Sequence, residues 1–173
     1  MNENKFWDII ALLDWDKTGD DDAVLEPACQ ALATQQDDAI FEFENILAEK
    51  LLALDTREHC RACYAGELDP DDGDDYVSAD DFLYARCVVV ANGREFYASV
   101  LADPANMPQG MEFEAMLSLP AASFERKTGK DYPHIPPVNY ESFQNSVGWA
   151  PIATTRPGKF TGENIPPGNR RPT

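Results

Sequence analysis

The sequence has no long apolar run: no stretch approaches the roughly 18 residues that would suggest a transmembrane helix. It also has no leader in which a basic segment precedes an apolar one, because the chain opens Met1-Asn2-Glu3. From these two absences we expect no membrane span, no signal peptide and a cytoplasmic location. In that compartment the four cysteines are expected to be reduced thiols.

Recognisable catalytic motifs are also missing. There is no glycine-rich loop of the kind that holds phosphates, no Gly-x-Ser-x-Gly nucleophile motif, and only two histidines, His59 and His134. Carboxylates are so abundant that no pair of them stands out. We therefore expect a protein that is not an enzyme. An enzyme that uses surface carboxylates is the alternative, and it would require acids that converge in a concave pocket and have strongly shifted pKa values.

Positive charge is scarce and unevenly distributed. The chain carries 14 Lys and Arg against 31 Asp and Glu, a net charge of −17. Residues 1–81 have a net charge of −18, whereas residues 82–173 have a net charge of +1. Such a negative first half repels nucleic acids and anionic membranes, and it attracts cations and basic proteins. The alternative is that the charge serves solubility alone.

The fold is expected to centre on Phe82–Pro104, the longest apolar stretch. A helix that is apolar on nearly every side belongs inside a core. Ser78 with Asp81 has the form of a capping box and predicts the helix start, and Asn92-Gly93 predicts its end. A second helix is predicted over Arg94–Ala102 with Phe96, Tyr97, Val100 and Leu101 facing inward. The β-branched residues 88–90 leave a short buried strand as the alternative.

The remaining pattern predicts a mainly α, single-domain bundle of about six helices. At 173 residues, 43% of them hydrophobic, the chain is long enough to bury a core. Pro120 should kink or split the last helix, and residues 131–149 should form an extended aromatic strap on the helices. The domain is predicted over residues 1–149 and a flexible, basic tail rich in Pro and Gly over 150–173. The other helices are predicted at Asn4–Leu13, Asp22–Ala33, Ala39–Tyr64 and Glu112–Thr128.

Four segments resemble a bacterial family catalogued as domain-of-unknown-function family 4240. They are FW-x-II near the start, FE-x-ILAEKL-x-ALDTR at 43–57, DFLYARC-x-VVANGREFY at 81–97 and FERKTGK at 124–130. The resemblance spans about residues 1–149, and the segment at 81–97 is its most specific part. It implies a small, mostly helical, cytosolic domain, and it supplies no reaction and no catalytic residues.

Two short motifs suggest metal binding. Asp14, Asp16, Thr18, Gly19 and Asp20 reproduce the first half of a calcium-binding EF loop, but the position that should carry the closing carboxylate holds a leucine. The simpler interpretation is an acidic turn that caps a helix. The segment His59-Cys60-x-x-Cys63 is half a zinc site. Only Cys87 and His134 are available to complete it, and buried thiols are the simpler interpretation.

Arg86 is the single charge within the apolar central stretch. We expect it to be buried or half-buried and to need a carboxylate partner, with Glu44, Asp55 or Glu95 as candidates. A core ion pair is the favoured role, and a ligand-binding arginine is the alternative.

The leading hypothesis is a non-enzymatic module that binds a basic protein through its acidic first half. One concrete form is an immunity or antitoxin-type inhibitor that covers the basic active site of a toxin. The alternative is a calcium-responsive module that uses Asp14, Asp16, Thr18, Asp20 and the Asp69–Asp75 loop, and no other cofactor is expected. Oligomeric state is left open. The predicted partner contacts are Asp20, Asp21, Asp22, Asp37, Asp38, Asp69, Asp71, Asp72, Asp74 and Asp75.

Overall fold

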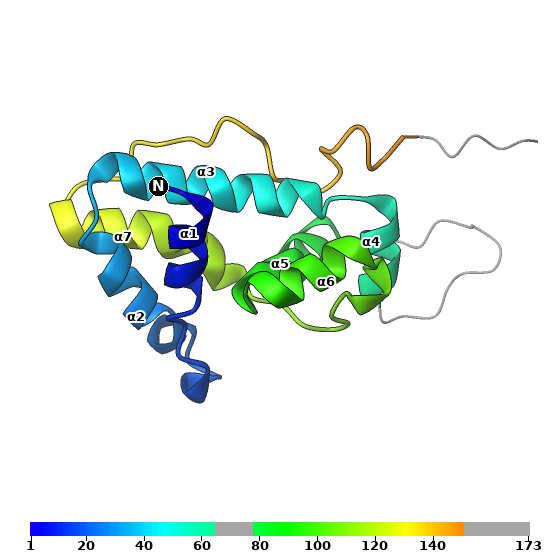
Figure 1. The fold of residues 1–173 in the computed structure, drawn as a ribbon, viewed down its shortest axis with the longest axis horizontal. Coiled ribbons are helices and arrows are strands. Elements are labelled where there is room, and N and C mark those ends of the chain that lie inside the picture. The colour runs from blue at the N-terminus through cyan, green and yellow to red at the C-terminus, as the bar shows by residue number, and fades with distance from the viewer. Residues whose placement is uncertain (65–77, 151–173) are drawn as a thin grey trace, which may run out of the picture.

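The protein is a helical domain, seen here in a computed structural model that describes residues 1–64 and 78–150 (Figure 1). Within these ranges the chain forms α-helices and short 3-10 helices and contains no strand, as predicted. No helix in the described ranges is both long and apolar enough to cross a membrane. The predicted tail beyond Ala150 lies outside the described residues. The helices are α1 (Glu3–Ile10), η1 (Trp15–Lys17), α2 (Asp21–Ala33), α3 (Asp37–Ala53), α4 (Arg57–Cys63), α5 (Ala79–Ala91), α6 (Arg94–Ala102), η2 (Pro104–Asn106), η3 (Glu114–Ser118) and α7 (Leu119–Thr128).

Helix α5 lies at the centre of the core, as its all-round apolar sequence predicts. Every residue from Phe82 to Ala91 is buried except Tyr84, which is partly buried. The side chain of Ser78 accepts a hydrogen bond from the backbone N–H of Asp81, which caps the start of the helix. The helix ends at Asn92-Gly93, where Gly93 has a φ of 89° that favours glycine. The β-branched residues 88–90 are therefore helical, and the strand alternative is wrong.

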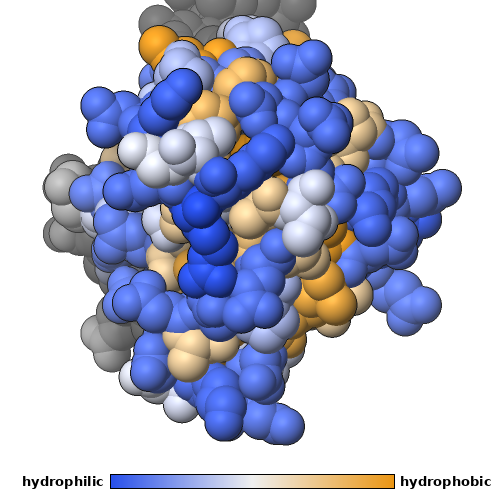
Figure 2. Space-filling view, turned by 90° about the vertical axis from the view of Figure 1, so that its left-hand side faces the viewer, coloured by the Kyte–Doolittle hydropathy of each residue, from blue (hydrophilic) through white to orange (hydrophobic). Residues whose placement is uncertain are grey.

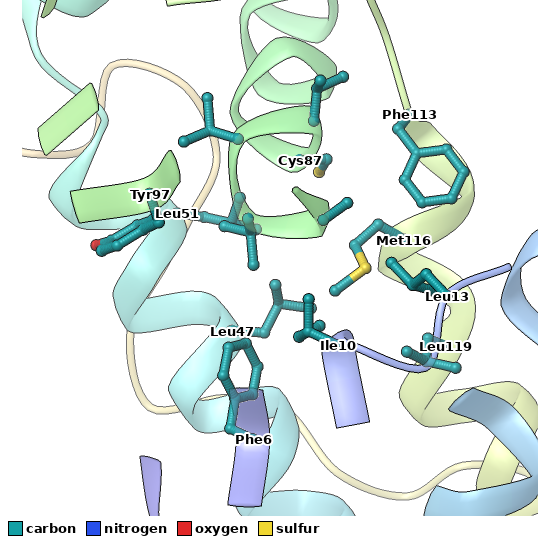
Figure 3. Close-up of a cluster of buried hydrophobic side chains, with 14 of the residues drawn as sticks. Phe6, Ile10, Leu13, Leu47, Leu51, Cys87, Tyr97, Phe113, Met116 and Leu119 are labelled. Atoms are coloured by element: carbon teal, nitrogen blue, oxygen red, sulfur yellow. The ribbon is translucent and has the colours of Figure 1, made fainter. Parts of the chain in front are cut away.

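The core joins residues that are distant in sequence. Side chains from α1, α3, α5, η3 and α7 converge in Figure 3, where Phe6 and Ile10 of α1 lie beside Leu47 of α3 and near Met116 of η3. Phe6 and Met116 are fully buried. Burying a large apolar side chain contributes about 1.5–3 kcal/mol, so this convergence holds the first helix against the rest of the bundle.

The predicted single helix Ala39–Tyr64 is wrong, because the chain breaks between α3 and α4. Helix α3 ends at Ala53, and α4 begins after Thr56, whose hydroxyl accepts the backbone N–H of His59. The apolar spacing continues through Leu54, so periodicity gave no sign of the break. The bundle consequently has seven α-helices in the described residues rather than six.

The segment 112–128 is split at its proline, as predicted. Pro120 lies in the first turn of α7, where its missing N–H costs no helical hydrogen bond. The residues before it form η3 instead of an α-helix. One detail differs from prediction, since Leu101 is 44% exposed.

Residues 131–149 form the predicted strap, which is extended in its first part and turns from residue 141 onward; we call it the strap below. It runs beside α3 as the yellow-to-orange trace in Figure 1. Its first part packs on Phe41, whose ring lies 5.7 Å from that of Tyr132 and 4.9 Å from that of His134. The hydroxyl of Tyr132 donates to the Glu44 carboxylate at 2.9 Å. Burial raises the pKa of Glu44, and this hydrogen bond opposes the rise.

Candidate functional site: an acidic groove beside helix α2

An acidic groove lies between the start of α2 and η3. Its volume is about 740 Å³. A second hollow of about 280 Å³ continues along α2 and α7 and shares Asp22 and Ser118 with the first. The larger hollow, called the acidic groove below, is lined by Gly19, Asp20, Asp21, Asp22, Glu114, Ala115, Leu117 and Ser118.

Local sequence places three aspartates on the groove. Gly19 adopts a φ of 102°, a backbone conformation that favours glycine and that turns the chain into α2. Asp20 then caps the helix, because its carboxylate accepts the backbone N–H of Ala23 at 3.1 Å. Asp21 and Asp22 occupy the first turn, where the positive end of the helix dipole stabilises negative charge. Helix capping and the helix dipole therefore explain why the three carboxylates gather here, and no bound ligand is needed to hold them together.

The groove carries negative charge without a matching base. In the ranges 1–64 and 78–150 the ion pairs are Glu3–Lys50, Glu26–Arg126 and Asp37–Lys127, so no base pairs with Asp20, Asp21, Asp22 or Glu114. A hydrogen bond to Glu114 is the main cause that raises the pKa of Tyr84 to about 12. The smaller hollow differs, because Arg126 neutralises Glu26 at its wall and lowers the pKa of that carboxyl.

The predicted partner contacts do not all come together. Asp37 and Asp38 begin α3, beyond the far end of α2, which at 13 residues is about 20 Å long. Lys127 holds Asp37 in an ion pair and also donates to the backbone carbonyl of Gln35. The predicted contacts at 69–75 lie outside the described residues. Asp20, Asp21 and Asp22 are thus the part of the predicted set that lines the groove.

Glu114 is the groove residue that sequence reasoning missed. It belongs to the half of the chain whose net charge is close to zero, and nothing in its local pattern distinguishes it. It reaches the groove because η3 packs against α2 and α5. The long-range contact, rather than any motif, assigns it to the site.

An aromatic pair adjoins the acidic loop. Trp15 in η1 is 42% exposed, and its ring lies 5.3 Å from that of Phe113, the residue before η3. Phe113 is buried, so the indole rests against the edge of the core while much of Trp15 stays exposed. Exposed tryptophans beside charged surfaces are common anchors at protein interfaces. The face of the molecule seen in Figure 2 is predominantly hydrophilic, with smaller hydrophobic areas.

In the loop that resembles an EF hand, side-chain oxygens form hydrogen bonds with nearby backbone groups. The carboxylate of Asp14 accepts the backbone N–H of Asp16, and the hydroxyl of Thr18 donates to the carbonyl of Trp15. Asp20 caps α2. Across the described part of the chain, no three His, Cys, Asp or Glu side chains are grouped in a way that could hold a metal ion. Calcium binding at this loop stays a prediction.

The His59–Cys63 motif forms α4, where its side chains have protein partners. His59 Nε2 donates to the carbonyl of Val100 at 3.1 Å, which leaves Nδ1 to accept from the Thr56 hydroxyl at 2.7 Å. Burial lowers the pKa of His59, consistent with a neutral ring. The Cys63 thiol donates to the carbonyl of Cys60, and all four cysteines are buried and free. The thiol of Cys60 also lowers the pKa of Cys63 through a hydrogen bond.

Arg86 is fully buried, but the expected direct ion pair is absent. Its guanidinium donates to the carbonyls of Leu51 and Tyr140, at 2.9 and 3.0 Å, and to the hydroxyl of Ser142 at 2.8 Å. No carboxylate in the described residues lies within ion-pair distance of it. Burial lowers the pKa of Arg86, and the charge of Asp55 is the largest opposing influence. Neutral oxygens thus satisfy the arginine, and Asp55 acts on it through space.

Asp55 is the second buried charge, and it binds the strap. One carboxylate oxygen accepts the backbone N–H of Phe143 and the indole N–H of Trp149, each at 2.9 Å. The other accepts the backbone N–H groups of Gln144 and Asn145. Asp55 is fully buried, so these charge-assisted hydrogen bonds compensate its loss of water. We call Asp55, Arg86 and their strap partners the buried charge cluster.

Comparison with known proteins found a match to a protein family. A family model described as "Protein of unknown function (DUF4240)" matches residues 1–126. No curated protein and no solved structure matches. The matched region contains all residues that line the acidic groove, together with Asp55 and Arg86, whereas the strap lies beyond it.

Proposed function

This chain belongs to the DUF4240 family, and we propose that it is a non-enzymatic cytoplasmic module that binds a basic protein through the acidic groove. The observation that carries the proposal is the set of Asp20, Asp21, Asp22 and Glu114 around one hollow, with no ion-pair partner in the described residues. The hollow can receive a lysine or arginine side chain of a partner. Those carboxylates would then replace water with charge-assisted hydrogen bonds.

The charge distribution supports a role in association. A surface of one sign steers an oppositely charged partner and raises the association rate, an effect that salt weakens. The exposed face of Trp15 supplies apolar area next to this surface, and a tryptophan anchor of this kind usually contributes more affinity than charges at the rim. Charge and anchor together fit a partner with a basic patch beside an apolar depression.

The specific form we propose is an immunity or antitoxin-type inhibitor. The basic active site of a nucleic-acid-cleaving or otherwise cationic toxin is the kind of surface that an acidic groove can cover. The inhibitor needs no catalytic group of its own, which agrees with the scarcity of catalytic motifs in the sequence.

Affinity capture from the native host tests the proposal. The tagged protein is incubated with lysate at about 50 mM and about 500 mM salt, where the Debye length differs severalfold. We expect a basic partner that is retained at low salt and lost at high salt. Isolation of no stoichiometric partner at either salt would contradict the proposal.

A matched pair of variants assigns the contact to the groove. The triple variant D20N/D21N/D22N removes three negative charges from the groove and keeps the α2 cap, because asparagine also caps helices. The control E49Q/E58Q/E95Q removes the same charge from exposed sites on α3, α4 and α6. Loss of the partner in the first variant alone supports the groove. Equal loss in both would show that only overall charge matters.

A calcium-responsive module is the second candidate. It rests on the oxygen spacing of Asp14, Asp16, Thr18 and Asp20, which lie in one loop beside the groove. Calorimetry with millimolar Ca²⁺ tests it, with D14N/D16N as the control variant. Absence of heat from the native protein would dispose of this candidate and leave the protein-binding proposal untouched.

A further inference from the structure

The buried charge cluster has a feature beyond the proposed function: Asp55 takes all its side-chain hydrogen bonds from the strap. Four donors reach its carboxylate, namely the backbone N–H groups of residues 143, 144 and 145 and the Trp149 indole. Within the described part of residues 1–126, no donor reaches this carboxylate. Since an unpaired buried carboxylate is very unfavourable, the helical domain presents an acceptor that requires an added segment.

The strap is shaped as an anion-binding turn. Phe143 has a φ of 70°, and among the described residues it is the only one other than glycine with a positive φ. This conformation directs three successive backbone N–H groups toward one point, an arrangement that binds anions. Recognition of Asp55 therefore relies mainly on backbone atoms, and the side chain of Phe143 is 44% exposed.

Side-chain contacts on both sides of the turn add selectivity. Arg86 binds the carbonyl of Tyr140 and the hydroxyl of Ser142, and that hydroxyl donates in turn to the carbonyl of Ala79. Asn145 donates its side-chain N–H to the carbonyl of Leu52 at 3.0 Å. The helical domain thus binds the Ser142 hydroxyl and the Asn145 amide, which lie at a fixed spacing along the strap.

Close backbone approach adds a steric requirement at Gly148. A Cβ at this position would lie 2.7 Å from Thr56 Cγ2 and 2.8 Å from the carbonyl oxygen of Asp55. The carbonyl of Gly148 accepts the backbone N–H of Arg57 at 3.2 Å, so the strap pairs with the start of α4. The Arg57 guanidinium lies 5.3 Å from the ring centre of Trp149. Only a residue without a side chain fits here.

We infer that Asp55, Thr56, Arg57 and Arg86 form a peptide-binding cleft, and that residues 139–150 occupy it as an intramolecular ligand. The ligand class is a segment with three successive N–H donors at a turn, a hydroxyl and an amide side chain as polar anchors, a glycine three residues after the amide, and a tryptophan directly after the glycine. Covalent attachment gives the chain's own strap a high effective concentration, so it excludes other segments until it is released. A segment of the same chemistry supplied from outside competes for the cleft.

Exchange of the strap in trans tests the inference on the folded full chain. A protease recognition sequence is introduced in residues 135–138, where Ile135 is 84% exposed, and the purified protein is cut there. A fluorescein-labelled peptide of residues 139–150 is then added in excess, and its anisotropy is followed. We expect the peptide to replace the severed segment and to saturate at one per protein. The uncut protein is expected to take up no peptide.

Peptide variants provide controls that leave the protein unchanged. Replacing Gly148 with alanine introduces the clash and should weaken binding by about tenfold or more. Replacing Trp149 with phenylalanine removes one hydrogen bond to a charged acceptor and should weaken binding by about tenfold. Replacing the adjacent Val147, which is 85% exposed, with alanine should leave affinity unchanged.

Three results would overturn the inference. The cut protein could fail to bind the labelled peptide, it could bind the Gly148→Ala and Val147→Ala peptides equally, or it could unfold when the segment dissociates, as circular dichroism would show. The first or the third result would mean that the strap is an integral part of the fold, and the second would mean that the contacts at Gly148 do not define a specific site. None of them bears on the acidic groove, whose lining residues are elsewhere.

Discussion

The acidic groove and the buried charge cluster use the same residue type in opposite settings. Asp21 and Asp22 are exposed at the start of a helix and have no ion pair in the described residues. Asp55 is fully buried and receives four hydrogen bonds. An exposed carboxylate is solvated already, so it contributes little to folding and remains available to a partner. A buried one depends on its donors, so its contribution is structural.

This contrast separates effects on stability from effects on binding. Substitutions in the buried charge cluster should reduce the free energy of unfolding. Substitutions in the acidic groove should leave that free energy nearly unchanged and reduce partner affinity. Variants that do both would show that the two regions are coupled, and variants that do neither would remove the physical basis for distinguishing them.

The largest effect is expected for Arg86→Met. The substitution leaves Asp55 without its nearby positive charge and leaves the carbonyls of Leu51 and Tyr140 without a donor. Removing one of two buried charges that compensate each other through space costs about 3–5 kcal/mol, which should appear as a lower urea midpoint with a similar slope. The control is Arg94→Met, because Arg94 is exposed and its loss should cost less than about 1 kcal/mol.

The next largest effect on stability is expected for Asp55→Asn, which can be compared directly with the same substitution at an exposed aspartate. Asp55→Asn keeps the side-chain size but loses the charge that accepts four donors, and it should lower the free energy of unfolding by about 2–3 kcal/mol. Asp21→Asn makes the same chemical change on the surface and should alter the free energy of unfolding by less than about 0.5 kcal/mol. Similar values for both variants in urea denaturation would refute the contrast drawn above.

A smaller effect is expected on binding. At about 0.5 kcal/mol per exposed charge, D20N/D21N/D22N should weaken binding of the captured partner by about tenfold at low salt. The difference from the native protein should shrink at high salt because screening already weakens the native interaction. Titration calorimetry or biolayer interferometry at two salt concentrations measures it. Trp15→Ala should weaken binding at both salts, because apolar contact is not screened.

The smallest effect is a pH dependence from His59. Burial places the pKa of His59 in the folded protein below its ordinary value of 6.5, so the unfolded chain binds more protons in the interval between the two. The free energy of unfolding should therefore fall as the pH drops below about 6.5, and this contribution should be constant above it. His59→Gln removes the titration while keeping a side-chain donor toward Val100. If the pH dependence of the variant equals that of the native protein, His59 has no such role.

Local sequence rules predicted much of the fold. The cap at Ser78, the end at Gly93 and the split at Pro120 follow from the chemistry of the individual residues. The break between α3 and α4 did not follow, because Leu47, Leu51 and Leu54 keep the helical spacing up to the end of α3. The break is associated with the hydrogen bonds that Asp55 and Thr56 make, and those of Asp55 come from a segment almost 90 residues further along the chain.

The candidate site shows the same division. The cluster Asp20–Asp22 was visible in the sequence, because helix starts favour acidic residues and charge can be counted. Glu114 was not visible, since only the packing of η3 against α2 brings it to the groove. The partner of Arg86 was predicted to be a carboxylate, and the structure instead gives it the carbonyls of Leu51 and Tyr140 and the hydroxyl of Ser142.

Residue types and their spacing were thus sufficient for the helical class, the central position of α5, most helix ends and the negative first half. These properties depend on local backbone preferences, on hydrophobic burial and on total charge, all of which act over a few residues or over the whole chain. The tertiary structure alone decided which carboxylates meet at one groove and which donors compensate Asp55 and Arg86. Such pairings depend on directional hydrogen bonds between distant segments, and no short-range pattern in the sequence encodes them.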